Sequence, residues 1–148
     1  MKSELPESLP DAKRYLPDWT ERRFVVVDRT GRWASAISAE ANGHLDSDTA
    51  VLTFQSCESA REAADFWELR NTIGFVLFLE GMERECLGFL GRLGRSNYHR
   101  EILVVATENH REILPVIMEA GVESILFDVS DDVPVAEWCR RAAARRIR

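Results

Sequence analysis

The stretch IGFVLFLE, residues 73–80, is apolar or glycine at every position until it ends in one carboxylate, Glu80. A strand with one solvated face alternates apolar and polar residues, whereas a strand buried on both faces of a parallel sheet does not. Four more runs resemble it: RFVVVD (23–28), TAVLTF (49–54), EILVVAT (101–107) and ESILFD (123–128). Because segments of helical period separate these runs, the sequence predicts a three-layer α/β fold. Its five-stranded parallel sheet would be doubly wound in the order 2-1-3-4-5.

Length and composition limit the class of protein. With 148 residues, 45% hydrophobic and 30% charged, the chain has the size of one globular domain with its own core. Three prolines interrupt a charged N-terminal stretch, so we expect a flexible or surface-draped leader over residues 1–22 and one domain over 23–148. The net charge of −6 disfavours direct binding to nucleic acid. No apolar run reaches the ~18 residues of a spanning helix, so we expect no targeting to a membrane.

The spacing of cysteines and histidines predicts no metal site, cofactor or catalytic residue. Cys57, Cys86 and Cys139 are odd in number and far apart, which is typical of small packing residues in a reducing cytoplasm. The histidines, His110 among them, have neither the paired spacing of metal ligands nor a serine nucleophile nearby. We therefore expect them at the surface.

Apolar residues at helical spacing predict which face of each helix is buried. The last three helices have the clearest stripes, and the fourth must accommodate Pro115 in its first turn. The predicted core residues are Met82, Cys86, Phe89, Leu90 and Leu93 in the third helix, Ile113, Val116, Ile117 and Ala120 in the fourth, and Val135, Trp138, Cys139 and Ala142 in the fifth.

Residues outside these stripes predict interaction surfaces. Gly88 and Gly91 lie away from the core stripe of the third helix, where a glycine costs about 0.5–1 kcal/mol relative to alanine. Either a partner or the leader packs its backbone there, or the helix is merely a poor one. The fourth and fifth helices carry four further apolar residues off their stripes: Leu114, Met118, Ala143 and Ile147. Together these four predict an apolar patch for a homodimer or a protein partner.

The strand ends bring charged residues to one edge of the predicted sheet. Parallel strands share their carboxyl edge, and ligands of such folds bind there. The residues at these ends are Asp28 and Arg29, Leu79 and Glu80, Ala106 and Thr107, and Asp128. Three carboxylates are therefore expected to face one crevice.

The segment ILVVATENHREILPVIMEAGVESILFDVSDDVPVAEWCRRA (102–142) resembles receiver domains of bacterial response regulators, and the resemblance covers about residues 23–146. It implies a flavodoxin-like fold. Working receivers carry two acids for magnesium, a phospho-accepting aspartate, a hydroxyl residue and a lysine. At those positions this chain has Asp28 and Arg29 for the acids, Leu79 or Glu80 for the acceptor, Ala106 or Thr107 for the hydroxyl, and Asp128 for the lysine. The resemblance therefore implies a degenerate receiver pocket.

Two interpretations of that pocket remain open. Arg29 is expected to act as an internal cation for Asp28, Glu80 and Asp128, which removes the need for magnesium. In this hypothesis Glu80, if it stands at the acceptor position, imitates a phosphoryl group. The alternative is a rim of separately solvated acids at the starts of loops.

The sequence thus favours a non-enzymatic, phosphorylation-independent signalling module. We expect it to act by protein contact in the cytoplasm, either alone or with a downstream output domain of a larger regulator. An alternative from another class is a flavodoxin-like enzyme or small-ligand binder that uses the acidic crevice.

Overall fold

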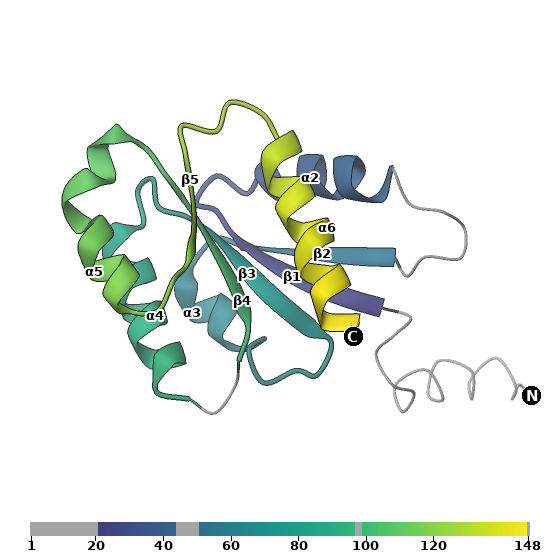
Figure 1. Cartoon of the computed structure of the whole chain (residues 1–148), viewed down its shortest axis with the longest axis horizontal. Coiled ribbons are helices and arrows are strands. Elements are labelled where there is room, and N and C mark those ends of the chain that lie inside the picture. The colour runs from purple at the N-terminus through teal and green to yellow at the C-terminus, as the bar shows by residue number, and fades with distance from the viewer. Residues whose placement is uncertain (1–20, 44–50, 97–98, 148) are drawn as a thin grey trace, which may run out of the picture.

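The computed structural model of the protein describes residues 21–43, 51–96 and 99–147 and contains the predicted five-stranded sheet (Figure 1). The strands are β1 (Glu21–Val27), β2 (Val51–Cys57), β3 (Thr72–Phe78), β4 (Glu101–Ala106) and β5 (Ser124–Phe127). All neighbouring pairs are parallel, and the strand order is β2-β1-β3-β4-β5. The predicted α/β class and strand order are confirmed, and they are those of a flavodoxin-like fold.

Helices follow the strands in alternation. They are α2 (Trp33–Asn42), α3 (Ala60–Ala64), α4 (Glu83–Gly94), the 3-10 helix η1 (Glu108–Ile113), α5 (Leu114–Glu119) and α6 (Val133–Ile147). The predicted leader lies outside the described residues except for its last two, Glu21 and Arg22, which already belong to β1.

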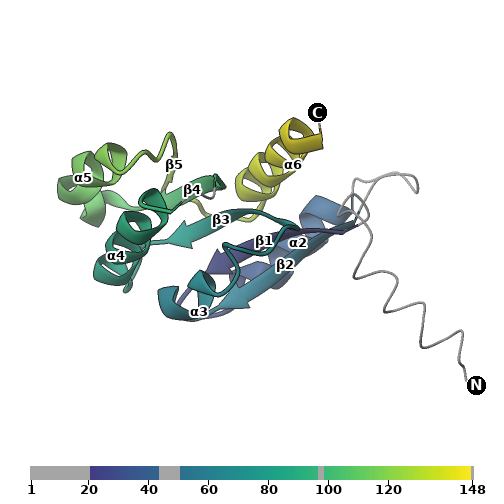
Figure 2. The same ribbon diagram turned by 90° about the horizontal axis from the view of Figure 1, so that it is seen from below.

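The sheet separates two hydrophobic clusters. Helices α2 and α6 pack on one face, where Ile37 and Trp138 meet Phe24 and Val76. Helices α3, α4 and α5 pack on the other face. Figure 2 shows α3 and α4 on the side of the sheet opposite to α6. Every residue of β3 is buried, because this strand has neighbours on both sides and helices on both faces. The uninterrupted apolar run that predicted a central strand has this physical cause.

The predicted core stripes are confirmed in α4 and α6 and are partly wrong in α5. All five stripe residues at α4 and all four in α6 are buried. In α5 only Ile117 of the predicted stripe is fully buried, whereas Val116 and Ala120 are exposed. The reason is that α5 packs beside the short edge strand β5, whose residues are themselves only partly buried or exposed. The sheet therefore covers a narrow line of α5 around Ile117, and Val116 and Ala120 lie outside it.

Two further expectations are wrong. Ala143 is buried against the α2 and α6 cluster, because α6 buries a wider stripe than its four predicted residues. Strand β2 does not end at Phe54 but continues to Cys57. Gln55 and Ser56 stay in register with Val25 and Val26 of β1, and β2 is an edge strand where polar side chains can reach solvent.

Candidate functional site

The crevice at the carboxyl edge begins with Asp28, directly after β1. Its side chain is only 4% exposed. Oδ1 accepts from the backbone N–H and the hydroxyl of Thr30, and Oδ2 accepts from the backbone N–H groups of Arg32 and Trp33 at 3.1 Å each and from the same hydroxyl at 2.9 Å. Asp28 thus satisfies amides at the start of α2, which otherwise have no partner inside the helix. Its carboxylate shapes the β1–α2 loop.

Arg29 turns toward the β3–α4 corner. Its Nη1 donates to the carbonyl oxygen of Gly81 at 3.1 Å, and Gly81 has the left-handed φ of 75°. A Cβ at Gly81 would lie 3.1 Å from Cδ of Arg29. Glycine at this position therefore leaves room for the arginine side chain and also permits the left-handed backbone of the turn. Within the part of the chain that the structure describes, Arg29 forms no ion pair with Asp28, Glu80 or Asp128. The expected network around Arg29 is therefore not formed: the arginine binds a main-chain carbonyl instead.

Leu79 and Glu80 have opposite environments. Leu79 is fully buried, and its amide donates to the carbonyl of Val105 at 3.1 Å, directly after β3 pairs with β4. Glu80 is exposed, and its Oε1 lies 3.9 Å from Nε2 of His110. The first position after β3 therefore holds an apolar side chain, which cannot accept a phosphoryl group. Ala106, the last residue of β4, is likewise fully buried.

His110 is buried at 2% exposure, which the sequence reasoning missed. The backbone N–H of Thr107 donates to its Nδ1 at 2.9 Å, while its Nε2 lies 2.9 Å from Oε2 of Glu83. An N–H donor facing Nδ1 requires a lone pair there, so Nε2 carries the proton and donates to Glu83. Thr107 also caps η1, since its hydroxyl accepts from the N–H of Asn109. The spacing Thr-x-x-His after a strand, with histidine in place of the glutamate of a capping box, could have revealed this contact.

The half-exposed carboxylate of Glu83 is held in its charged form. Its pKa lies below the ordinary 4.5, first because its own backbone N–H at the start of α4 donates to it, and then because His110 does. Glu83 and His110 therefore join the start of α4 to the start of η1. This contact links two loops of the crevice without a metal ion.

The cation near Asp128 is Arg111 and not Arg29, which we expected there. The residue adopts a left-handed φ of 50°, and its amide donates to the carbonyl of Ala106 at 2.8 Å. The pKa of Arg111 is raised by hydrogen bonding and charge from Glu108, and further by the charge of Asp128. The guanidinium of Arg111 also lies over the ring of Phe127, 5.9 Å from its centre. Arg111, at the side of the crevice next to β5, is therefore the cation near Asp128.

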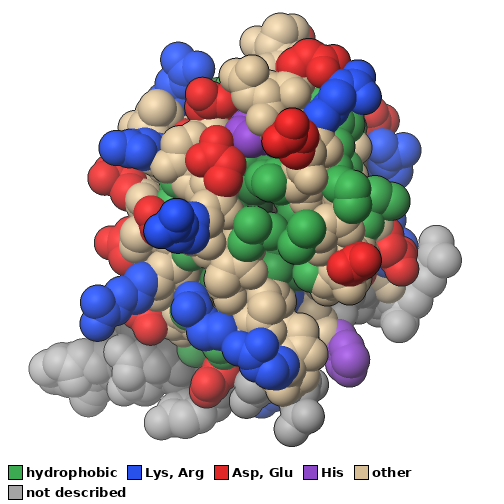
Figure 3. Space-filling view, turned by 90° about the vertical axis from the view of Figure 1, so that its left-hand side faces the viewer, with side chains coloured by type: hydrophobic (Ala, Val, Ile, Leu, Met, Phe, Trp, Pro, Cys, Tyr) green, Lys and Arg blue, Asp and Glu red, His purple; other side chains and the backbone are tan. Residues whose placement is uncertain are grey.

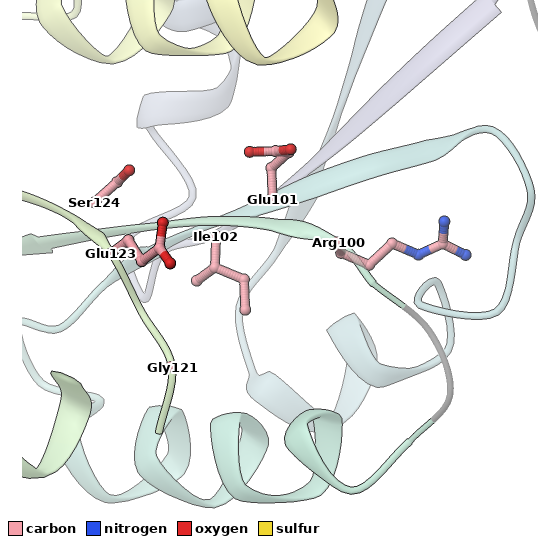
Figure 4. Close-up of a pocket in the computed structure, with 6 residues that line it drawn as sticks. All are labelled: Arg100, Glu101, Ile102, Gly121, Glu123 and Ser124. Carbon is pink, nitrogen blue, oxygen red and sulfur yellow. The ribbon is translucent and has the colours of Figure 1, made fainter. Parts of the chain in front are cut away.

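Among the hollows of the described residues, two larger ones lie at opposite edges of the sheet. One, of about 290 Å³, lies beside the Asp28 loop at the carboxyl edge and is lined by Arg32, Trp33, Ala36, Ser130, Asp131 and Asp132. The other, of about 230 Å³, lies where β4 and β5 begin (Figure 4). There Arg100 points away from Glu123 and Ser124, and its Nε donates to the carbonyl of Trp67 at 2.8 Å. Of these two hollows, the first lies at the edge where folds of this type bind ligands.

The expected interface residues divide into exposed and buried ones. Gly88 is exposed with open space where a Cβ would be, and Gly91 is half-buried. Met118 is 61% exposed, but Leu114 packs partly against the α4 side of the core. The side chain of Ile147 lies outside the described residues. The largest exposed apolar side chains in this region are instead Met118, Val116 at 52% and Phe127 at 42%.

Comparisons with known proteins identify no family. A scan against models of protein families found no match, and a search of curated proteins found no relative. In the described ranges, His, Cys, Asp and Glu side chains form no group of three or more that could hold a metal ion. Across the same ranges, every helix is too short or too polar to cross a lipid bilayer.

Proposed function

We propose that this chain is a receiver-like regulatory module that acts by protein contact and without phosphorylation. One observation carries the proposal: large apolar side chains of α5 and of the edge strand β5 are exposed, beside a crevice in which Asp28 and His110 already have hydrogen-bond partners. Val116, Met118 and Phe127, which we call the α5–β5 face, belong to α5 and to the edge strand β5. Figure 3 shows apolar side chains between charged ones on this side of the molecule. Exposed apolar area of this kind is typical of protein interfaces.

The state of the crevice supports a non-enzymatic role. The carboxylate of Asp28 accepts hydrogen bonds from backbone amides of its own loop, and Leu79 is buried. Both ring nitrogens of His110 also have hydrogen-bond partners. The three cysteines are free and buried, and burial raises the pKa of Cys86 to about 12, so its thiolate is scarce at neutral pH. Free, buried thiols also fit the cytoplasm that the proposal assumes.

The partner we propose is a second copy of this chain. Charges of both signs border the α5–β5 face, with Arg111 over Phe127 and Asp128 directly after it. In a two-fold arrangement the same patch meets itself, and charges of both signs allow an arginine of one copy to pair with an aspartate of the other. A basic or an acidic rim alone would repel its own copy.

Sedimentation velocity on matched variants tests this proposal. Val116 and Val51 are similarly exposed, at 52% and 59%, but Val51 lies in β2 at the far edge of the sheet. We expect a dimer with a Kd on the order of micromolar, weakened at least about tenfold by Val116→Glu and unchanged by Val51→Glu. Magnesium with a small phosphodonor should leave the Kd unchanged. A wild-type chain that stays monomeric at about 200 μM, or equal effects of the two variants, would contradict the proposal.

A second candidate function rests on the hollow beside the Asp28 loop. Its volume of about 290 Å³ and its mixture of Arg32, Trp33 and two aspartates suit a small polar ligand. A thermal-shift screen with metabolites separates the two candidates. Saturable stabilisation by one compound, lost in Trp33→Ala, would favour the ligand binder.

A further inference from the structure

We propose that the neutral ring of His110 holds η1 and α5 against the start of α4, and that protonation of the ring weakens this contact. We call the contact of His110 with Thr107 and Glu83 the latch. The latch itself stands on the geometry around the ring, while its effect on association rests on the proposed function above. It goes beyond that function by assigning a regulatory signal, a change in pH, to a residue of the crevice.

The ring is held in one protonation state by its two partners. The N–H of Thr107 donates to Nδ1 at 2.9 Å, and this backbone group can act only as a donor. Nε2 donates to Glu83 at 2.9 Å. Both contacts are satisfied together only by the neutral ring that carries its proton on Nε2. The ring is buried at 2% exposure, so water cannot replace either partner without movement.

A second proton would break one contact and keep the other. It would sit on Nδ1 and point at the N–H of Thr107, so that two donors face each other and the His110 half of the capping box is lost. The Thr107 hydroxyl, 3.3 Å from Nδ1, is the acceptor within reach of the new proton, and it still accepts from the Asn109 N–H. The charged groups facing the ring across the crevice are Glu83, which remains a good acceptor, and Glu80, whose Oε1 is 3.9 Å from Nε2. On the element of His110 itself, Arg111 and Glu108 pair with each other. The imidazolium is therefore drawn toward the carboxylates and away from Thr107.

The element that the latch fastens has few other anchors. In α5 only Ile117 is fully buried, while Leu114 and the last residue of η1, Ile113, are half-buried. Elements with few buried side chains are those that open locally below the free energy of global unfolding. Because α5 also carries Val116 and Met118, loosening it disturbs the α5–β5 face. Acid should therefore release this face.

Two measurements on the full chain test the latch. Nitrogen NMR of the histidine rings at about pH 7.5 should show Nδ1 of His110 without a proton. Amide exchange then follows residues 108–119 between about pH 7.5 and 5, the range in which imidazoles titrate, with α6 as the internal reference. After correction for intrinsic exchange, we expect protection in 108–119 to fall at least about tenfold while that of α6 stays constant.

Matched variants assign the effect to this ring. His110→Gln keeps a side-chain acceptor for the Thr107 N–H, as glutamine does in a capping box, but cannot titrate. It should make protection independent of pH, whereas His99→Gln should behave as the wild type. A protonated Nδ1 at about pH 7.5, constant protection in the wild type, or a fall that persists in His110→Gln would overturn the latch.

Sedimentation at both pH values separates the latch from the proposed dimer. We expect the dimer to weaken at about pH 5 in the wild type and not in His110→Gln. If the wild type is monomeric at both pH values, the proposed dimer fails, and the exchange data alone decide on the latch. If protection falls but dimer affinity does not, the inferred control of the face by His110 is wrong.

Discussion

Asp28 shows how a residue of a metal-binding pattern can serve the backbone instead. Its buried carboxylate accepts from amides of Thr30, Arg32 and Trp33, and so replaces partners that α2 cannot supply to its own first turn. In a magnesium site the same oxygens would need free lone pairs directed at the ion. The aspartate is therefore explained by the β1–α2 loop alone.

Removing that carboxylate should lower stability whether or not magnesium is present. We expect Asp28→Ala to reduce the free energy of unfolding by about 2–3 kcal/mol, because buried amides lose their acceptor. Asp28→Asn should cost less, since its carbonyl oxygen still accepts. Urea unfolding with and without magnesium measures both, and the exposed Glu68→Gln is the control. Stabilisation of the wild type by magnesium that Asp28→Ala abolishes would show a metal site instead.

The Glu83 carboxylate contributes to folding stability at neutral pH and loses that contribution in acid. Its pKa is lowered in the folded state, so its contribution is present above the ordinary value of 4.5 and is lost as pH falls through the folded pKa. Glu83→Gln should thus lower the free energy of unfolding at pH 7 by about 0.3–1 kcal/mol, the scale of a half-exposed charge at a helix N-terminus. Unfolding in urea from pH 7 to 3 should show the two proteins converging as the pH falls below the ordinary 4.5 and through the lowered pKa of Glu83. Glu137→Gln, on the exposed side of α6, should show no such convergence, and a constant gap for Glu83→Gln would rule out the linkage.

At the scale of an element, the question for α4 is whether its fold requires glycine at positions 88 and 91. Apart from the helix's own backbone, no atom of the described residues would lie within 4 Å of a Cβ at Gly88, and at Gly91 Nη1 of Arg95 would lie 3.8 Å away. Alanine at each should therefore raise the free energy of unfolding by about 0.5–1 kcal/mol, through lower backbone entropy in the unfolded chain. Thermal or urea unfolding measures this gain. Gly74→Ala in β3 is the opposite control, because its Cβ would lie within van der Waals overlap of the Glu101 carbonyl oxygen and should destabilise the sheet.

The glycine variants also decide between the two interpretations of this face. If a partner packs its backbone on α4, Gly88→Ala and Gly91→Ala should stabilise the monomer and weaken association together. Unchanged association in sedimentation velocity would leave α4 as a poor helix and no more.

The elements that sequence predicts best are those whose residues share one environment. Strand β3 is buried on both faces, and α4 and α6 each keep one stripe against the sheet, so apolar pattern and burial coincide. The η1–α5 unit departs from this rule because it packs beside the edge strand β5, which is only partly buried, so that only Ile117 of α5 is fully buried and Val116 is exposed. The burial of His110 could not be predicted from the sequence because it also depends on a residue that is distant in the chain. Its ring is buried by contacts with Glu83 and Thr107, and only the second lies close enough in the chain to leave a pattern.

The sequence predicts where the candidate site lies, but it does not predict which of its side chains contact one another. Parallel strands place Asp28, Thr107 and Asp128 at one edge by topology alone. Which charges meet there depends on loops, where Gly81 offers Arg29 a main-chain carbonyl and Arg111 approaches Asp128. Such choices between carbonyls and carboxylates are decided by distances of a few ångströms that no spacing encodes.

At the scale of the whole molecule, the sheet makes the two hydrophobic clusters depend on each other. Phe75 and Leu77 of β3 face the α4 side, while Val76 and Phe78 face the α6 side. Loss of either helical layer exposes one face of the same strand. We therefore expect the two layers to open together in one cooperative transition, as is usual for a domain of this size.

The reactivity of the three cysteine thiols measures whether the two helical layers open together, because the thiols lie in different parts of the core. Cys86 lies in the α4 cluster, Cys139 in the α6 cluster and Cys57 at the end of β2. Burial raises the pKa of Cys57 to about 11 and of Cys86 to about 12, and it raises that of Cys139 as well. Alkylation at about pH 8 therefore requires the chain to open, and mass spectrometry of the peptides follows each thiol separately. Normalised to the unfolded chain, Cys86 and Cys139 should give the same free energy of opening. If Cys86 reacts more than about tenfold faster, the α4 side opens alone and the sheet does not unite the two layers.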